Sequence, residues 1–282
     1  MKNAIRTLLR GVGQVMLQNN ALTGLLFLAG IFYNSWIFGV GALLGNVIST
    51  LFALIFKNSK QDIENGLYGF NGTLVGIAVW FFFGVSVTTT VAIILGAILS
   101  TVIMHEMKKR MPAFTAPFVL ATWVIIFGLP FFHLSSLANS TLPAETSLNA
   151  LSASGMGFGQ VMFQGNIVTG ALFLLALIVS SRTAALYALY GSLLGGAFAL
   201  LLSLPLASIN LGLFGYNAVL CGIALSDKKW SAFLFATFAI LLSVFLQYGL
   251  GQIGLITLTA PFVIATWGTL LIKKLLHGTT AH

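Results

Sequence analysis

Two copies of one short motif place hydrogen-bonding groups inside strongly apolar sequence. The copy that starts at Phe114 reads FTAPFVLATW and the copy that starts at Leu258 reads LTAPFVIATW, with eight of ten positions identical. A proline inside a helix removes one N–H donor and leaves the carbonyl four residues earlier without its helical partner. We therefore expect proline-kinked helices that form the walls of a pore or binding slot, although kinked helices with only a packing role are the plainer interpretation. The candidate acceptors are the carbonyls of Ala113 and Thr257 and the hydroxyls of Thr115 and Thr259.

The composition is that of a membrane protein. Of the 282 residues, 58% are hydrophobic and only 6% are charged, whereas soluble domains carry about 25% charged residues. Apolar runs of about 20 residues, the length that crosses a bilayer as a helix, recur along the chain. The net charge of +8 is better explained by cationic cytoplasmic loops than by nucleic-acid binding. We predict an all-α polytopic membrane protein.

Ten apolar runs are the candidate spans, and residues 1–18 are expected to form a helix at the membrane interface. A polar stretch at 133–155 separates two groups of five runs and is expected to be an exposed linker. The predicted domains are therefore 1–132 and 156–282. The expected spans are 21–33, 36–56, 66–83, 85–104 and 113–132, followed by 160–179, 184–204, 212–225, 231–248 and 258–272.

The two groups of runs are copies of each other. QVMLQNNALTGLLF, from Gln14, matches QVMFQGNIVTGALF, from Gln160, at nine of 14 positions. GLYGFNGTLVGIAV, from Gly66, matches GLFGYNAVLCGIAL, from Gly212, at eight of 14. Both pairs are 146 positions apart and the proline motifs are 144 apart. Such self-similarity at a nearly fixed spacing indicates a duplicated structural unit.

The distribution of charge predicts how the two copies cross the membrane. When the N-terminus is cytoplasmic and each run crosses once, all 13 Lys and Arg residues fall on the cytoplasmic side, as the positive-inside rule requires. Five crossings per half invert the second copy and leave both termini in the cytoplasm. Inverted repeats place the functional site near the bilayer centre, between the halves. The glycine-rich runs GLYGFNG and GLFGYN weaken a helix, so we expect a re-entrant or broken segment at each; close helix packing is the alternative.

The paired TAPF, GLxG[FY]N and QVMxQxN motifs resemble those of the bacterial urea transporter family. The family signature is similar to LPxxTxPF; here MPAFTAPF has Met111 for the leucine, and LITLTAPF has Ile256 for the first proline. The resemblance covers nearly the whole chain outside the linker. It implies ten spans with two re-entrant half-helices and a homotrimer in the lipid of the bacterial inner membrane. It also implies one pore per protomer and passive urea conduction without a cofactor.

The resemblance further implies a flat pore with aromatic rings on its faces and oxygen acceptors along one edge. Leu17 stands where a phenylalanine is expected, and Gln160 where a glutamate can occur. Urea is planar and neutral with four N–H donors, which suits such a slot, whereas an ion would lose its hydration without compensation. By the resemblance, the residues expected to line the pore are Gln14, Val15, Leu17, Phe70, Leu74 and Thr115 in the first half and Gln160, Val161, Phe163, Tyr216, Leu220 and Thr259 in the second. Ala113 and Thr257 are expected to contribute their backbone carbonyls.

Other functions find less support in the residues. An ammonium channel would need histidines within a span, and an ion-coupled transporter would need carboxylates there, but neither residue type lies mid-span. Glu64, beside GLYGFNG, is the nearest acid, and its repeat partner is Asn210. An enzyme would need a nucleophile with a base or a metal-binding cluster, which we do not find. A channel or secondary transporter for another small neutral solute, or for ammonia or ammonium, remains the alternative, and a non-conducting receptor or assembly protein is not excluded.

Overall fold

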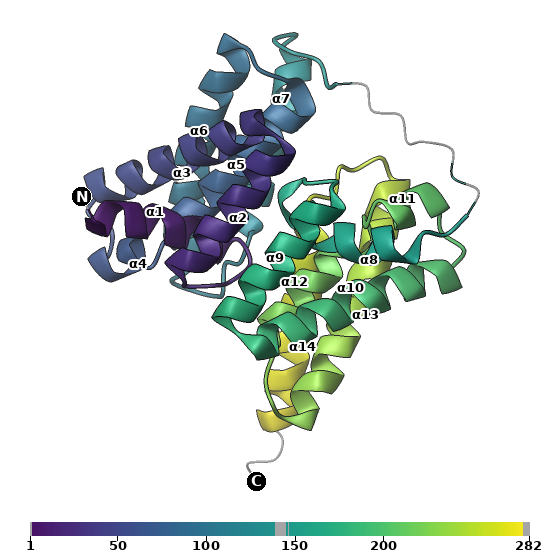
Figure 1. Cartoon of the computed structure of the whole chain (residues 1–282). Helices are drawn as coiled ribbons and strands as arrows, with labels where there is room; N and C mark the ends of the chain where they lie inside the picture. Colours follow the sequence, from purple (N-terminus) through teal and green to yellow (C-terminus); the bar gives the residue numbers. More distant parts are fainter. Residues whose placement is uncertain (1, 139–144, 146, 279–282) are drawn as a thin grey trace. The chain divides into compact units, whose positions relative to one another are not determined.

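The computed structural model describes residues 2–138, 145 and 147–278, and every regular element in that part of the chain is a helix (Figure 1). The all-α class is therefore confirmed. By its internal contacts the chain divides into two compact units, Met1–Thr141 and Leu142–His282. Each unit has the same succession of helices, as a duplicated sequence requires.

The helices of the first unit are α1 (Lys2–Gln14), α2 (Ala21–Asn34), α3 (Trp36–Ile55), α4 (Lys60–Glu64), α5 (Gly69–Phe83), α6 (Val87–Met107) and α7 (Ala116–Phe131). The second unit repeats this order. Its elements are α8 (Ala150–Gly159) with the 3-10 turn η1 (Gln160–Met162), α9 (Ile167–Ser180), α10 (Arg182–Leu201), α11 (Leu206–Asn210), α12 (Tyr216–Ala224), α13 (Trp230–Gln252) and α14 (Ala260–Gly278).

Among the described residues, four helices are long and apolar enough to cross a bilayer alone, namely α3, α6, α10 and α13. A fifth span results when α8 with η1 and α9, which meet at 74°, are counted as one bent crossing. The shorter apolar helices α2, α5 and α7 have 10–17 residues each. These helices confirm a multi-pass membrane protein, whereas the ten crossings and the inversion of the second half stay predictions.

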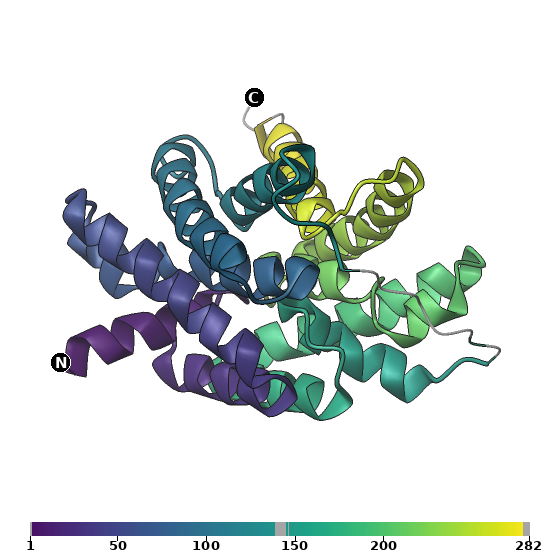
Figure 2. The ribbon, with the colours of Figure 1, turned by 90° about the horizontal axis from the view of Figure 1, so that it is seen from above.

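One helix lies at the centre of each unit. α5 contacts α3, α6 and α7, and α12 makes the matching contacts with α10, α13 and α14 (Figures 1 and 2). Every residue of α5 from Gly69 to Trp80 is buried. A Cβ atom built on Gly45 of α3 would lie 1.9 Å from the carbonyl oxygen of Gly72 in α5. Gly72, the last glycine of the GLYGFNG run, therefore serves close helix packing.

The glycine-rich runs form the turns that lead into the two central helices. α5 begins at Gly69 and α12 at Tyr216, three and four residues later than the expected spans. Gly66 and Gly212 have left-handed φ values of 76° and 72°, a conformation that glycine adopts without a steric penalty. The runs are therefore joints between a short helix and a central helix.

The sharpest interruption lies instead in the QVMxQxN motifs, where we expected a continuous span over 160–179. The helical path ends at Met162, and α9 begins only at Ile167. Phe163 in this gap has a φ of 62°, and Leu17 at the matching place between α1 and α2 has a φ of 60°. Because a left-handed residue cannot continue a right-handed helix, the expected uninterrupted helix is wrong.

The polar residues of the QVMxQxN motif stabilise this interruption. The carboxamide nitrogens of Gln18 and Gln164, both buried, donate to the backbone carbonyl two residues earlier. Asn20 and Asn166 are the N-caps of α2 and α9. Each Oδ1 accepts the backbone N–H groups two and three residues later, at 2.8–3.3 Å. The motif therefore encodes a turn followed by a capped helix.

Two further features lie at the edges of the units. The expected linker 133–155 contains the first turns of α8, which Asn149 caps through a 3.0 Å hydrogen bond from the backbone N–H of Ser152. In α1, the helix expected at the interface, Val12 near the end is fully buried within the unit, and the place of this helix relative to the membrane stays a prediction. Residues 139–144 and 146 of the linker and the ends 1 and 279–282 lie outside the described residues.

Candidate solute-binding site

The TAPF motifs start helices and do not kink them. Ala116 is the first residue of α7 and Ala260 is the first residue of α14. Pro117 and Pro261 therefore lie in the first turn, where a backbone N–H has no helical partner and proline is readily accommodated. The predicted kinked helices are wrong because the chain ahead of each motif is not helical.

The carbonyls expected to be freed by the prolines close tight turns. The carbonyl oxygen of Ala113 accepts the N–H of Ala116 at 3.1 Å, and that of Thr257 accepts the N–H of Ala260 at 3.0 Å. Each oxygen thus already accepts one hydrogen bond, although a carbonyl has a second lone pair. Because neither proline removes a helical hydrogen bond here, the prolines do not by themselves make these two oxygens available to a solute.

A left-handed residue places each threonine of the motif at a helix start. Phe114 and Leu258 have φ values of 46° and 48°, which turn the chain immediately before Thr115 and Thr259. The two threonines are 0% and 3% exposed. Thr115 occupies the N-cap position of α7, but its hydroxyl does not cap the helix.

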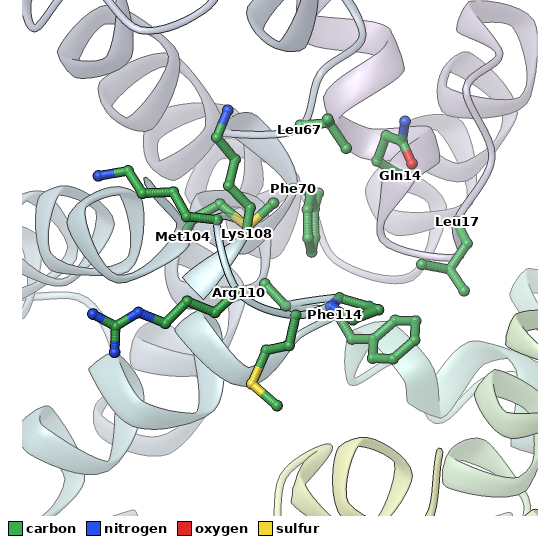
Figure 3. Close-up of a pocket in the computed structure, with 12 residues that line it drawn as sticks. Gln14, Leu17, Leu67, Phe70, Met104, Lys108, Arg110 and Phe114 are labelled. Carbon is green, nitrogen blue, oxygen red and sulfur yellow. The ribbon is translucent and has the colours of Figure 1, made fainter. Parts of the chain in front are cut away.

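The first-unit residues of the predicted pathway partly converge on one pocket of about 520 Å³. Gln14, Leu17, Phe70 and Ala113 are among its lining residues, and Figure 3 shows Gln14, Leu17 and Phe70 around the same space. Gln14 is held there by a 3.0 Å hydrogen bond from its Nε2 to the carbonyl oxygen of Asn65. The remaining predicted residues of this unit, which do not line the pocket, are the fully buried Val15, Leu74 and Thr115.

Three consecutive cations also line this pocket, which sequence reasoning had assigned only to a cytoplasmic loop. Lys108 pairs with Asp62, and the Lys109 ammonium lies 2.8 Å from Glu106. Burial disfavours the charged form of Lys108, but hydrogen bonding and the charge of Asp62 outweigh it and raise the pKa of Lys108. The Arg110 side chain extends away from Phe70 and Gln14 (Figure 3).

In the second unit, Tyr216 is anchored at the proline motif. Its hydroxyl donates to the carbonyl oxygen of Leu258 at 2.6 Å and lies 3.4 Å from the Thr257 hydroxyl. The side chain is 8% exposed. This anchoring brings three of the predicted elements of the second half together: the aromatic ring, the Thr257 turn and the start of α14.

The other predicted residues of the second unit occupy the interrupted segment and the central helix. Gln160 begins η1, and Phe163 is the left-handed residue that follows it; both are half-buried. Val161 in η1 and Leu220 in α12 are buried. Each therefore has the same place in its unit as its repeat partner in the first unit.

An asparagine that sequence reasoning missed holds each proline motif. Asn71 Oδ1 accepts the backbone N–H of Phe118 at 3.0 Å, and Asn217 Oδ1 accepts that of Phe262 at 3.1 Å. Asn71 and Asn217 are 0% and 1% exposed. The available signal was that both copies of GLxG[FY]N keep this polar residue in otherwise apolar surroundings.

Comparison with known proteins matches nearly the whole chain to one family. The family model described as urea transporter matches residues 5–274. The protein named Urea transporter 1 of Ovis aries is 32% identical over 288 residues, which cover 92% of this chain and 74% of that relative. Urea transporter 1 of Rattus norvegicus is 32% identical over 254 residues, covering 81% of this chain and 65% of the relative. These relatives are animal proteins, whereas the motifs had been compared with bacterial ones.

Proposed function

This chain belongs to the urea transporter family, and on that premise we propose that it conducts urea passively, as a channel and not as an enzyme. The observation that carries the proposal is the family match over residues 5–274. The match includes both copies of every motif singled out above. Neither the comparisons nor the site favours the alternative of ammonium or another small solute.

The proposed pathway follows the residues expected from the motifs. In the first unit Gln14, Leu17, Phe70 and Ala113 border one pocket, which supports placing the solute there. Thr115 would continue the path toward the start of α7. The other proposed lining residues are Val15 and Leu74 in the first unit and Gln160, Val161, Phe163, Tyr216, Leu220, Thr257 and Thr259 in the second.

The chemistry of these groups suits a neutral planar solute. Aromatic and aliphatic side chains contact the two faces of urea, while hydroxyl, carbonyl and carboxamide oxygens accept its N–H groups. Urea moves by exchanging one weak set of hydrogen bonds for the next, because a conducting site must bind well enough to admit the solute and weakly enough to release it. A cation finds no acidic side chain among these lining residues to offset the loss of its water.

We further propose the arrangement of the two units in the membrane. Ten crossings in two inverted repeats, with the pathway between them, account for the duplicated order of helices and for the one-sided cations. The nine-residue α12 is about 13.5 Å long, short of the roughly 30 Å bilayer core, which supports a half-helix there. The proposal includes a homotrimer in the bacterial inner membrane, cytoplasmic termini and domains at 1–132 and 156–282.

Flux into liposomes containing the purified protein tests the function. We expect urea to equilibrate rapidly and at the same rate with or without a proton or sodium gradient. Thiourea serves as the parallel solute, and protein-free liposomes give the background. Accumulation of urea above its outside concentration, driven by either ion, would contradict passive conduction.

A further inference from the structure

We propose that Asn71 and Asn217 are positioning residues that cap the TAPF helices from a neighbouring helix and thereby hold Thr115 and Thr259 in the pathway. This inference rests on the proposed pathway for the roles of the two threonines. The capping itself rests on hydrogen bonds within each unit.

The start of α7 lacks the usual means of capping. An N-cap side chain normally accepts the backbone N–H of the second or third helical residue. The second residue is Pro117, which has no N–H, and the Thr115 hydroxyl at the N-cap position makes no capping bond. The N–H of Phe118, the third residue, is the remaining capping donor, and Asn71 of α5 accepts it at 3.0 Å.

The second unit repeats this solution with the same residue type. Asn217 of α12 accepts the N–H of Phe262, the third residue of α14, at 3.1 Å. The helix around the asparagine has diverged, since Thr73 corresponds to Val219 and Gly72 to Ala218. The capping bond is therefore common to the two copies although neighbouring positions are not.

Burial makes this capping bond decisive for the position of the threonines. A buried N–H that loses its acceptor keeps the full desolvation penalty. The asparagine is fixed in a central helix, so its oxygen sets where the first turn of α7 or α14 can lie. Thr115 and Thr259 immediately precede those turns and are carried with them.

The two asparagines differ in what their amide nitrogen does. Asn217 Nδ2 donates to Gln247 Oε1 and, at 3.3 Å, to the carbonyl oxygen of Leu258. Asn71 Nδ2 is buried without a hydrogen-bond partner among the residues that the structure describes. Replacement by aspartate keeps the capping oxygen at both sites, but at 217 it also places an oxygen against two acceptor oxygens.

The test compares leucine and aspartate variants of both asparagines with Thr73→Val. Thr73 lies two residues from Asn71, is equally buried, and its hydroxyl donates within its own helix to the carbonyl of Gly69 at 3.0 Å. Hydrogen exchange is followed in the peptide covering 114–122, which contains the Phe118 N–H, and in the peptide covering 258–266, which contains the Phe262 N–H. Urea flux and the urea-to-thiourea flux ratio are measured on the same preparations.

We expect Asn71→Leu to accelerate exchange at Phe118 about 5- to 150-fold, as for a buried donor left unpaired, and to lower urea flux. Asn71→Asp should retain most of the flux and the slow exchange, Asn217→Asp should retain much less, and Thr73→Val should match the wild type. If a leucine variant does not fold, the two aspartate variants decide. Fast exchange at Phe118 in Asn71→Asp, which keeps the capping oxygen, or unchanged exchange in a folded leucine variant, would overturn the proposal. Wild-type urea flux tests the proposed function separately.

Discussion

At the scale of single residues, the two threonines of the TAPF motifs are the centre of the proposed pathway. Their sequence positions were recognised from the repeated motif, but the reason they are held in place was not. Phe114 and Leu258 adopt left-handed φ values that sequence does not reveal for large side chains, because such residues rarely adopt them. Each capping asparagine is far along the chain from the N–H that it accepts: Asn71 precedes Phe118 by 47 positions and Asn217 precedes Phe262 by 45. No local sequence pattern could have connected them.

Removal of either threonine hydroxyl should slow urea. Thr115→Val and Thr259→Val keep the shape of the side chain and delete an acceptor. Each should lower urea flux about 5- to 150-fold, the factor for leaving one N–H of the solute unpaired at about 1–3 kcal/mol. Stopped-flow flux into liposomes measures the effect. Thr269→Val on α14 is the control, since its buried hydroxyl donates to the Ala265 carbonyl of its own helix. An equal loss of flux in this variant would deny the two threonines a special role.

The ring and the hydroxyl of Tyr216 should have separable effects. Tyr216→Phe removes the bond to the Leu258 carbonyl but keeps the ring, as in the first unit, where Phe70 occupies the matching position. We expect it to keep the discrimination between urea and its larger analogues. Tyr216→Ala removes the ring, widens the slot and should admit larger amides. Flux ratios of urea, thiourea and methylurea measure this, and unchanged ratios in Tyr216→Ala would show that the ring does not line the pathway.

At the scale of elements, most helices were predictable because apolar runs bounded by caps define them. The expected spans 36–56 and 85–104 lie within about two or three residues of α3 and α6. The interruption was missed in the second copy of the QVMxQxN motif, because the motif contains no proline and its left-handed residue, Phe163, does not break helices by propensity. Carboxamide bonds from Gln18 and Gln164 decide the backbone there.

Close backbone contact across this interruption gives a stability prediction. A Cβ on Gly24 of α2 would lie 1.7 Å from the Leu9 carbonyl oxygen in α1, and one on Gly170 of α9 would lie 1.9 Å from the Gly155 carbonyl oxygen in α8. Gly24→Ala and Gly170→Ala should each destabilise the protein by about 1–3 kcal/mol, as overpacking does. Thermal unfolding in detergent measures it. Gly196→Ala in α10, with nothing within 4 Å, is the control and should not lower the melting temperature.

At the scale of the whole molecule, the duplication was visible in the sequence and recurs in the structure. Motifs 146 positions apart take the same backbone conformation, as the φ values of Gly66 and Gly212 show. The family resemblance was recognised from motifs that recur at matched spacing, and the family model over residues 5–274 confirms it. The length of each helix was less predictable, since the turns that shorten α5 and α12 depend on tertiary contacts.

The proposed membrane arrangement predicts a one-sided labelling pattern. In a Cys221→Ser background, single cysteines at Lys57, Lys108, Arg182 and Lys228 should react with a membrane-impermeant reagent only after the cells are permeabilised. The reason is that each replaces a cation of a loop predicted to be cytoplasmic. A cysteine at Leu137, expected on the outside, is the positive control. Labelling of position 108 or 228 in intact cells would exclude the inverted arrangement.

Because α7 and α14 begin within the TAPF motifs, each presents its N-terminal end to the threonine that precedes it. The aligned peptide dipoles give such an end the equivalent of roughly half a positive charge. The backbone itself therefore creates a positive electrostatic potential at Thr115 and at Thr259, without a charged side chain. On the proposed pathway a cation approaching either threonine would be repelled, whereas a solute without net charge would not. The helix starts that position the acceptors would then also discriminate between urea and ammonium.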